Sequence, residues 1–149
     1  MTAIQLGTMK TGFLSLITHP QHPDLVRVRI DDDLPALKPQ DDGSQIRYLA
    51  RFMDGEAGMM HVHNAMHTAL VDLDNRIYRK PLTKMIACVE AEDLDHERIW
   101  IDPAIPANDV SQIETLVRQR RAAHRRIDRI WQAVGFLGLL LLLLTSLKL

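Results

Sequence analysis

Hydrophobic residues follow three different spacings along this chain of 149 residues, and each spacing predicts a different kind of element. Up to residue 53 they form short runs or alternate with polar residues, which is the pattern of strands. From residue 54 to 91 they recur every three or four positions, which is the pattern of helices with one buried face. Near the C-terminus they dominate eighteen residues without a charge, which is typical of a membrane-spanning helix.

The extended segments are predicted to form a small antiparallel sheet. We place them at residues 12–18, 25–30, 45–53, 75–79 and 98–101. The first two should form a hairpin with a loop at residues 19–24, because Pro20 and Pro23 lack the amide hydrogen that regular pairing needs. Residues 31–43 hold five aspartates and two prolines, which predicts a loop with at most one helical turn.

Two helices should pack on this sheet, giving an α/β fold of the α+β type. The longer one is predicted over residues 54–73, with Asp54 as its N-cap. Its buried stripe would consist of Met59, Val62, Met66, Leu70 and Leu73. The shorter helix should run from Pro81 to about Ala91, and its Cys88 is expected in the core rather than as a nucleophile.

A third helix is predicted to begin at Asp109 or Ser111 and to continue into the apolar C-terminal stretch as one rod of about forty residues. Ser111 and Glu114 have the spacing of a capping box. An apolar stripe on this helix would allow two copies of the chain to form a short parallel coiled coil, and hence a homodimer. The stripe comprises Val110, Ile113, Val117, Ala123, Ile127 and Ile130.

The apolar stretch at residues 130–147 is predicted to be a single transmembrane helix. Its eighteen residues would rise roughly 27 Å, close to a hydrocarbon core of about 30 Å. The six leucines from Leu139 to Leu144 contribute roughly 2–4 kcal/mol to insertion. Trp131 stands at the N-terminal boundary, where indole rings favour the interface. A chain of this length has too little other structure to surround such a helix as a buried core.

Basic residues before the apolar stretch predict its orientation. Six arginines precede it, against Lys148 after it: Arg118, Arg120, Arg121, Arg125, Arg126 and Arg129. The positive-inside rule then predicts a tail-anchored, single-pass protein of the cell (inner) membrane with its N-terminal part in the cytoplasm. These arginines either contact anionic lipid headgroups or only set the topology. The chain therefore divides into a head (residues 1–107), a basic juxtamembrane helix (108–129) and the span (130–147).

The charge is distributed unevenly between these parts. The head carries 11 lysines and arginines against 16 aspartates and glutamates, whereas residues 108–149 carry 7 against 3. An acidic head disfavours nonspecific binding of nucleic acid, which needs local positive charge. A single cysteine forms no disulfide within the chain, which suits a reducing compartment. Residues 1–20 show no signal-peptide pattern, and residues 1–11 are expected to be a loose lead-in.

Short motifs in the head resemble the GIY-YIG endonuclease superfamily, in its phage-type branch. The opening GFLSLITHPQHPDLVRVR is similar to the paired first strands of that branch. The segments RYLARFM, HVHNAMHTAL, NRIYR and PLTKMIACVE then follow the family's order of strand, histidine-bearing helix, aromatic segment and closing helix. The resemblance covers about residues 12–91. It implies a small antiparallel sheet with packed helices.

The resemblance also implies which residues would do chemistry. In the family, a metal held by a glutamate assists hydrolysis of a phosphodiester, together with two tyrosines and an arginine. Ser15 stands at the first tyrosine's position, and Arg27 and Arg29 stand in the second strand motif. Arg76 stands at the position of the metal-binding glutamate, where an arginine would repel a cation. Of the family's functional residues only His67 is matched, so the resemblance implies a nuclease scaffold without nuclease activity.

Two clusters are candidate sites on their residues alone. Arg27 and Arg29 share a strand face, and Arg76 near them would complete a patch for phosphate or nucleic acid. The alternative is a solvated face paired with the aspartates of residues 31–33. His63 and His67 are four residues apart, a spacing that can bind zinc on a helix. The alternative is a histidine pair at the rim of the buried stripe.

The sequence thus predicts a tail-anchored membrane protein whose head binds a protein partner of unknown identity and is not an enzyme. No cofactor is expected, the bilayer is the predicted lipid partner, and nucleic acid is disfavoured as a partner. Two alternatives remain open. One is a membrane-tethered nuclease or nucleic-acid-binding protein of altered mechanism. The other is a metal sensor that uses His63 and His67.

Overall fold

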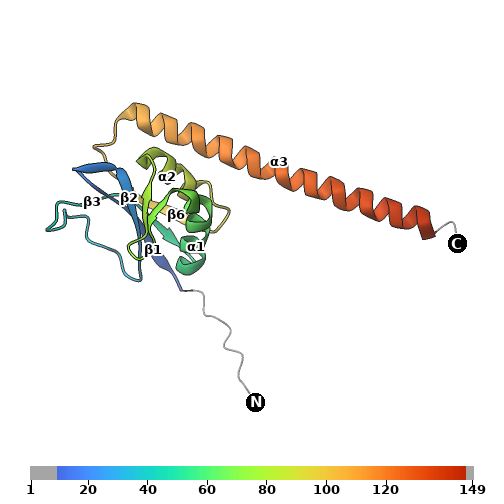
Figure 1. The fold of residues 1–149 in the computed structure, drawn as a ribbon, viewed down its shortest axis with the longest axis horizontal. Helices are drawn as coiled ribbons and strands as arrows, with labels where there is room; N and C mark the ends of the chain where they lie inside the picture. Colours follow the sequence, from blue (N-terminus) through green and yellow to red (C-terminus); the bar gives the residue numbers. More distant parts are fainter. Residues whose placement is uncertain (1–9, 147–149) are drawn as a thin grey trace, which may run out of the picture.

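A computed structural model of the protein describes residues 10–146 and has an α+β fold with an antiparallel sheet of six strands (Figure 1). The strands are β1 (Gly12–His19), β2 (His22–Asp31), β3 (Gln45–Phe52), β4 (Leu70–Asp72), β5 (Ile77–Arg79) and β6 (His96–Ile101). The helices are α1 (Gly55–Met66), the 3-10 turn η1 (His67–Ala69), α2 (Leu82–Glu90) and α3 (Ala107–Ser146). The predicted fold class is confirmed. Predictions for residues 1–9 and 147–149 lie outside the described residues.

The first strand lies inside the sheet, whose order is β4-β5-β2-β1-β3-β6. It pairs antiparallel with β2 on one side and β3 on the other. Because side chains alternate between the two faces of a strand, Leu14 and Leu16 enter the main core beneath α1 and α2. Ile17 lies on the opposite face in a smaller cluster with Ile46 and Leu49. The sheet is therefore buried on both faces around β1.

The turn between β1 and β2 is tighter than the sequence predicts. Pairing continues to His19 and His22, so only residues 20 and 21 form the turn. The prediction that Pro23 keeps this segment out of the sheet is wrong. Thr18 pairs with Val26, whereas the next residue, His19, pairs with His22. Residues 23–25 of β2 therefore form a bulge, which contains Pro23. A bulged residue has no ladder hydrogen bond to lose, so a proline is tolerated there.

The first helix begins as predicted and ends earlier. The carboxylate of Asp54 accepts the amide hydrogen of Ala57 at 3.0 Å, which confirms the N-cap. The helix stops at Met66, however, and the chain passes through η1 into β4. The prediction of a helix to Leu73 is wrong because Leu70 pairs with Tyr78 at the edge of the sheet. Pairing in the sheet outweighs the helical spacing of the apolar residues.

The last helix is a single rod of 40 residues, as predicted (Figure 1). It starts at Ala107, so the predicted starts at Asp109 or Ser111 are wrong. The carbonyl of Pro106 accepts the amide hydrogens of Asp109 and Val110. The predicted capping box is also wrong, because the Ser111 hydroxyl lies inside the helix and donates to the carbonyl of Ala107 at 3.1 Å.

Candidate functional site

The two halves of α3 have different surroundings. Ile113 and Val117 are buried against the main core, and Val110 and Leu116 pack beside them. Beyond residue 122 every described residue of α3 is exposed, including all six leucines of the leucine run. The most apolar window of this helix is 0% buried, and the helix is long and apolar enough to cross a membrane. The apolar half of α3 therefore has no partner among the described residues.

Polar groups extend the contact between α3 and the head. Nη2 of Arg121 donates to the carbonyl oxygen of Glu90, the last residue of α2, at 2.8 Å. One turn further along, Nδ1 of His124 lies 3.9 Å from Oδ2 of Asp93. His124 is six residues before Ile130, which is about 9 Å along a helix. The head is thus held close to the point where the apolar stretch begins.

The six arginines of α3 do not share one environment. Arg121 is bound to Glu90, and Arg120 lies beside the buried thiol of Cys88. The remaining four are exposed and form no ion pair with any residue from 10 to 146. They are Arg118, Arg125, Arg126 and Arg129. Contacts with lipid headgroups, predicted for all six, would fall mainly to these four.

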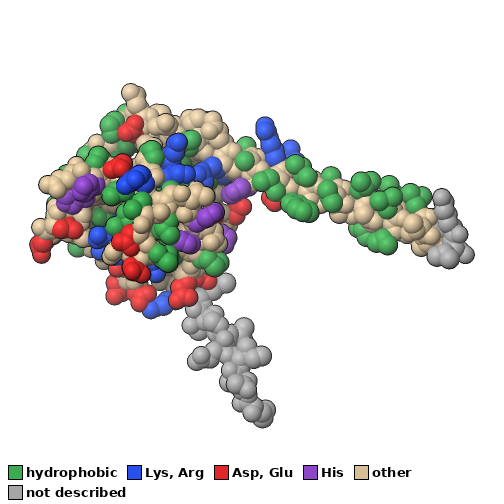
Figure 2. Space-filling model, in the orientation of Figure 1, with side chains coloured by type: hydrophobic (Ala, Val, Ile, Leu, Met, Phe, Trp, Pro, Cys, Tyr) green, Lys and Arg blue, Asp and Glu red, His purple; other side chains and the backbone are tan. Residues whose placement is uncertain are grey.

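A hollow of about 390 Å³ lies between the head and α3. Its walls carry His61 and Glu92 on the head, and His124 and Asp128 on α3. Nδ1 of His61 lies 3.2 Å from Oε2 of Glu92. Figure 2 shows histidine side chains gathered on the side of the head where the free part of α3 departs. Despite these histidines and acids, residues 10–146 contain no group of three side chains placed to hold a metal ion.

The structure separates the three arginines of the predicted phosphate patch. Arg27 and Arg29 lie on the face of β2 that points away from α1, and Nε of Arg29 binds Asp31 at 2.7 Å. The backbone of Arg76 is next to β2, because its carbonyl accepts the amide hydrogen of Val28 at 3.0 Å. The side chain of Arg76 instead lines a second hollow, on the α1 side of the sheet. A single three-arginine surface is not formed.

The two histidines of the predicted metal pair are each engaged elsewhere. Nδ1 of His63 lies 2.8 Å from the hydroxyl of Tyr78, and Nδ1 of His67 lies 2.7 Å from the carbonyl of Asn64. Because α1 ends at Met66, His67 belongs to the following turn and not to the same helix. Among residues 10–146 no third histidine, cysteine or carboxylate joins the pair in a group that could hold a metal ion.

The hollow beside α1 has a volume of about 400 Å³ and was not predicted. Glu56, His63 and Arg76 reach it from α1 and from the turn before β5, over a floor that includes Met59 and Tyr78. Burial raises the pKa of the Tyr78 hydroxyl, and the charge of Arg76 opposes that rise. Residue spacing gave no signal for this hollow, because its polar groups come from distant segments.

A partly exposed ion pair between α2 and β6 was also missed. Arg98 on β6 binds the carboxylate of Glu90 through Nε at 2.5 Å and Nη2 at 2.7 Å. The hydroxyl of Tyr48 is buried beside this pair, and burial raises its pKa. Glu90 thus joins β6 through its side chain and α3 through its carbonyl oxygen. This geometry makes Glu90 a structural junction.

Comparisons with known protein families, with curated proteins and with solved structures found no match for this chain. The geometry therefore has to support any functional conclusion by itself. Two features are the most informative. The apolar half of α3 has no partner among residues 10–146, and Nε of Arg27 on β2 has no hydrogen-bond partner in the same range.

Proposed function

We propose that this protein is a tail-anchored, single-pass protein of the cell (inner) membrane, with the head on the cytoplasmic side. One observation carries the proposal: the exposed apolar half of α3 continues, without a break, a helix that is packed on the head. A water-exposed surface of this apolar character is unfavourable, whereas the hydrocarbon interior of a bilayer matches it.

The polar residues within the apolar half fit the same proposal. The hydroxyl of Thr145 donates to the carbonyl of Leu142 at 2.8 Å, and that of Ser146 donates to Leu143 at 2.9 Å. In hydrocarbon an unsatisfied hydroxyl costs several kcal/mol, and these bonds remove that cost. The exposed arginines before Ile130 suit a cytoplasmic surface with anionic lipids.

For the head we propose a non-catalytic binding role on a GIY-YIG-like scaffold. The hairpin of β1 and β2, followed by β3 on the other side of β1, supports that comparison. The separation of Arg76 from Arg27 and Arg29 argues against one phosphodiesterase site. The hollow beside α1 gives the head a surface with apolar and charged groups for a partner.

Site-directed labelling in vesicles tests the orientation. Lys38 is exposed on the loop of the head and Cys88 is buried, so Lys38→Cys supplies one accessible thiol. An impermeant maleimide should label this variant in inside-out vesicles and leave it unlabelled in right-side-out vesicles. Wild-type protein is the matched control and should stay unlabelled in both. Labelling of Lys38→Cys only in right-side-out vesicles would place the head on the other side.

A nuclease assay on full-length protein in detergent tests the non-catalytic role. With Mg²⁺ or Mn²⁺ we expect no cleavage of single-stranded or double-stranded DNA or of RNA. His67→Ala is the matched variant, because His67 is the one residue that matches a functional residue of the family. Cleavage by the wild type that this variant loses would establish a membrane-tethered nuclease instead.

A further inference from the structure

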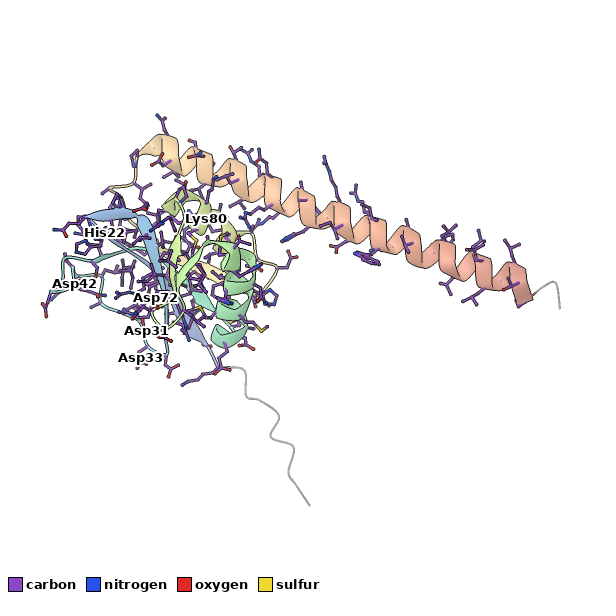
Figure 3. All side chains as sticks on the ribbon, in the orientation of Figure 1. His22, Asp31, Asp33, Asp42, Asp72 and Lys80 are labelled. Atoms are coloured by element: carbon purple, nitrogen blue, oxygen red, sulfur yellow. The ribbon has the colours of Figure 1, made fainter. Side chains whose placement is uncertain are left out.

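We propose that a small cavity at the β1–β2 turn binds a short-chain monocarboxylate, with Arg27 supplying the cation. The cavity has a volume of about 190 Å³ and lies between the end of the hairpin and residues 42–44. It is on the opposite side of the sheet from α1. Figure 3 shows His22 and Asp42, two of its lining residues, at the edge of the head away from the free end of α3.

Arg27 is the feature that points to an anion. Its Nε is buried and has no hydrogen-bond partner, and Arg27 forms no ion pair with any residue from 10 to 146. Five other arginines of the sheet and its edges do form ion pairs: Arg29, Arg47, Arg51, Arg79 and Arg98. A buried donor without an acceptor is costly, and a bound carboxylate would satisfy it.

Two other polar residues of the cavity, His19 and Asp42, already have hydrogen-bond partners within the head. The backbone amide of Gln21 donates to Nδ1 of His19, so the proton of this ring is on Nε2, which donates to the carbonyl of Asp42 at 2.7 Å. The Asp42 carboxylate accepts from the hydroxyl and the amide of Ser44. Those two bonds hold the pKa of Asp42 below its usual value, so the carboxylate stays charged. The charge of Arg27 also contributes to the lowered pKa of Asp42, but its Nε keeps no acceptor among residues 10–146.

Size and charge narrow the ligand to a short monoanion. A cavity of about 190 Å³ is smaller than the roughly 300–1,000 Å³ of typical cofactor and drug sites, which excludes a nucleotide. The charged Asp42 at the same cavity repels a dianion, such as phosphate above about pH 7, more strongly than a monoanion. The side chains of Ile17, Leu25 and Ile77 supply an apolar wall for an aliphatic chain.

The test uses full-length protein in phosphatidylcholine nanodiscs, with ¹³C-labelled isoleucine methyl groups. Butyrate should shift the Ile17 and Ile77 methyl signals saturably, with half-saturation near about 1 mM. The signal of Ile86, in the core on the other face of the sheet, should not move. Butyramide, a neutral compound of the same shape, should not saturate these shifts. Absence of saturation by butyrate, or equal saturation by butyramide, would overturn the proposal.

Two variants and one competitor complete the test. Arg27→Met should weaken butyrate binding by at least tenfold, while Arg51→Met, on β3 and outside the cavity, should bind butyrate like the wild type. Wild-type affinity in Arg27→Met, or competition by inorganic phosphate, would contradict the assignment. Without ligand, Arg27→Met should unfold at the wild-type temperature or above, because it removes a buried Nε donor that has no acceptor among residues 10–146. A lower unfolding temperature would make Arg27 structural and overturn the proposal.

Discussion

Arg121 of α3 donates a hydrogen bond from Nη2 to the carbonyl oxygen of Glu90 at 2.8 Å. Glu90 is the last residue of α2, and carbonyls at a helix C-terminus have no partner within their own helix. A cation at this end also interacts favourably with the helix dipole. The proposed anchor helix is therefore fastened to the head rather than joined to it by a flexible tether.

Removal of this contact should loosen α3 from the head. We expect Arg121→Ala to lower the free energy of unfolding by about 1 kcal/mol, the value of a typical hydrogen bond, because solvent weakens the charge of this exposed contact. Hydrogen exchange in residues 107–124 should become faster. Arg118→Ala removes an exposed arginine that makes no ion pair with residues 10–146 and is the matched control. Equal effects of the two substitutions would show that the Glu90 contact is unimportant.

The apolar part of the same contact should contribute more. Ile113 is 1% exposed and Ile127 is 52% exposed on the same helix. Ile113→Ala should cost about 2–4 kcal/mol of stability, because it leaves a cavity in the core. Ile127→Ala should change stability by less than about 0.5 kcal/mol. Chemical denaturation of full-length protein in detergent measures both, and a similar cost for the two would contradict the docked arrangement of α3.

A close backbone approach between β1 and α1 gives a third prediction. A Cβ atom on Gly55 would lie 2.8 Å from the Cα of Gly12, where no flexible side chain can move away. Gly55→Ala should therefore lower the free energy of unfolding by about 1–3 kcal/mol. Gly135→Ala is the control, because no atom lies within 4 Å of its added Cβ. Unchanged stability of Gly55→Ala in thermal unfolding would show that the backbones of Gly12 and Gly55 leave room for a methyl group.

The buried thiol of Cys88 predicts a loss of stability at alkaline pH. Burial raises its pKa from 9.0 to about 11, and the nearby charge of Arg120 opposes the rise only in part. The folded state thus keeps a proton that the unfolded chain has released. Stability should be complete below pH 9 and fall between pH 9 and 11, by at most about 2–3 kcal/mol. Denaturation of wild type and Cys88→Ala across this range should give curves that converge as pH rises. Parallel curves would contradict the raised pKa.

The sequence predicted those parts of the fold that depend on local pattern. A short apolar run located β1, alternation of apolar and basic residues located residues 25–30 of β2, and Asp54 located the start of α1. The end of α1 could not be predicted, because the strand pairing of Leu70 with Tyr78 depends on a segment eight residues further along. The bulge that accommodates Pro23 depends in the same way on the register of β1.

The candidate sites were less predictable than the fold. The apolar half of α3 is visible in the sequence because eighteen consecutive residues carry no charge and most of them are apolar. The cavity proposed to bind an anion is not visible in the sequence. Its lining residues, such as Ile17, Arg27 and Ile77, meet only in the folded sheet. Arg27 was singled out from the sequence, but as part of a patch with Arg76 that the fold separates onto two faces.

Membrane sedimentation after extraction at alkaline pH tests the central claim most directly. Full-length wild-type protein should remain in the pellet. Leu141→Arg should move to the supernatant, because an arginine at the centre of a span costs about 2.5–3.5 kcal/mol, comparable with the gain from the leucine run. Gln119→Arg, which adds the same charge on an exposed position of the docked half of α3, should stay in the pellet. Wild-type protein in the supernatant, or Leu141→Arg retained like the wild type, would contradict anchoring by α3.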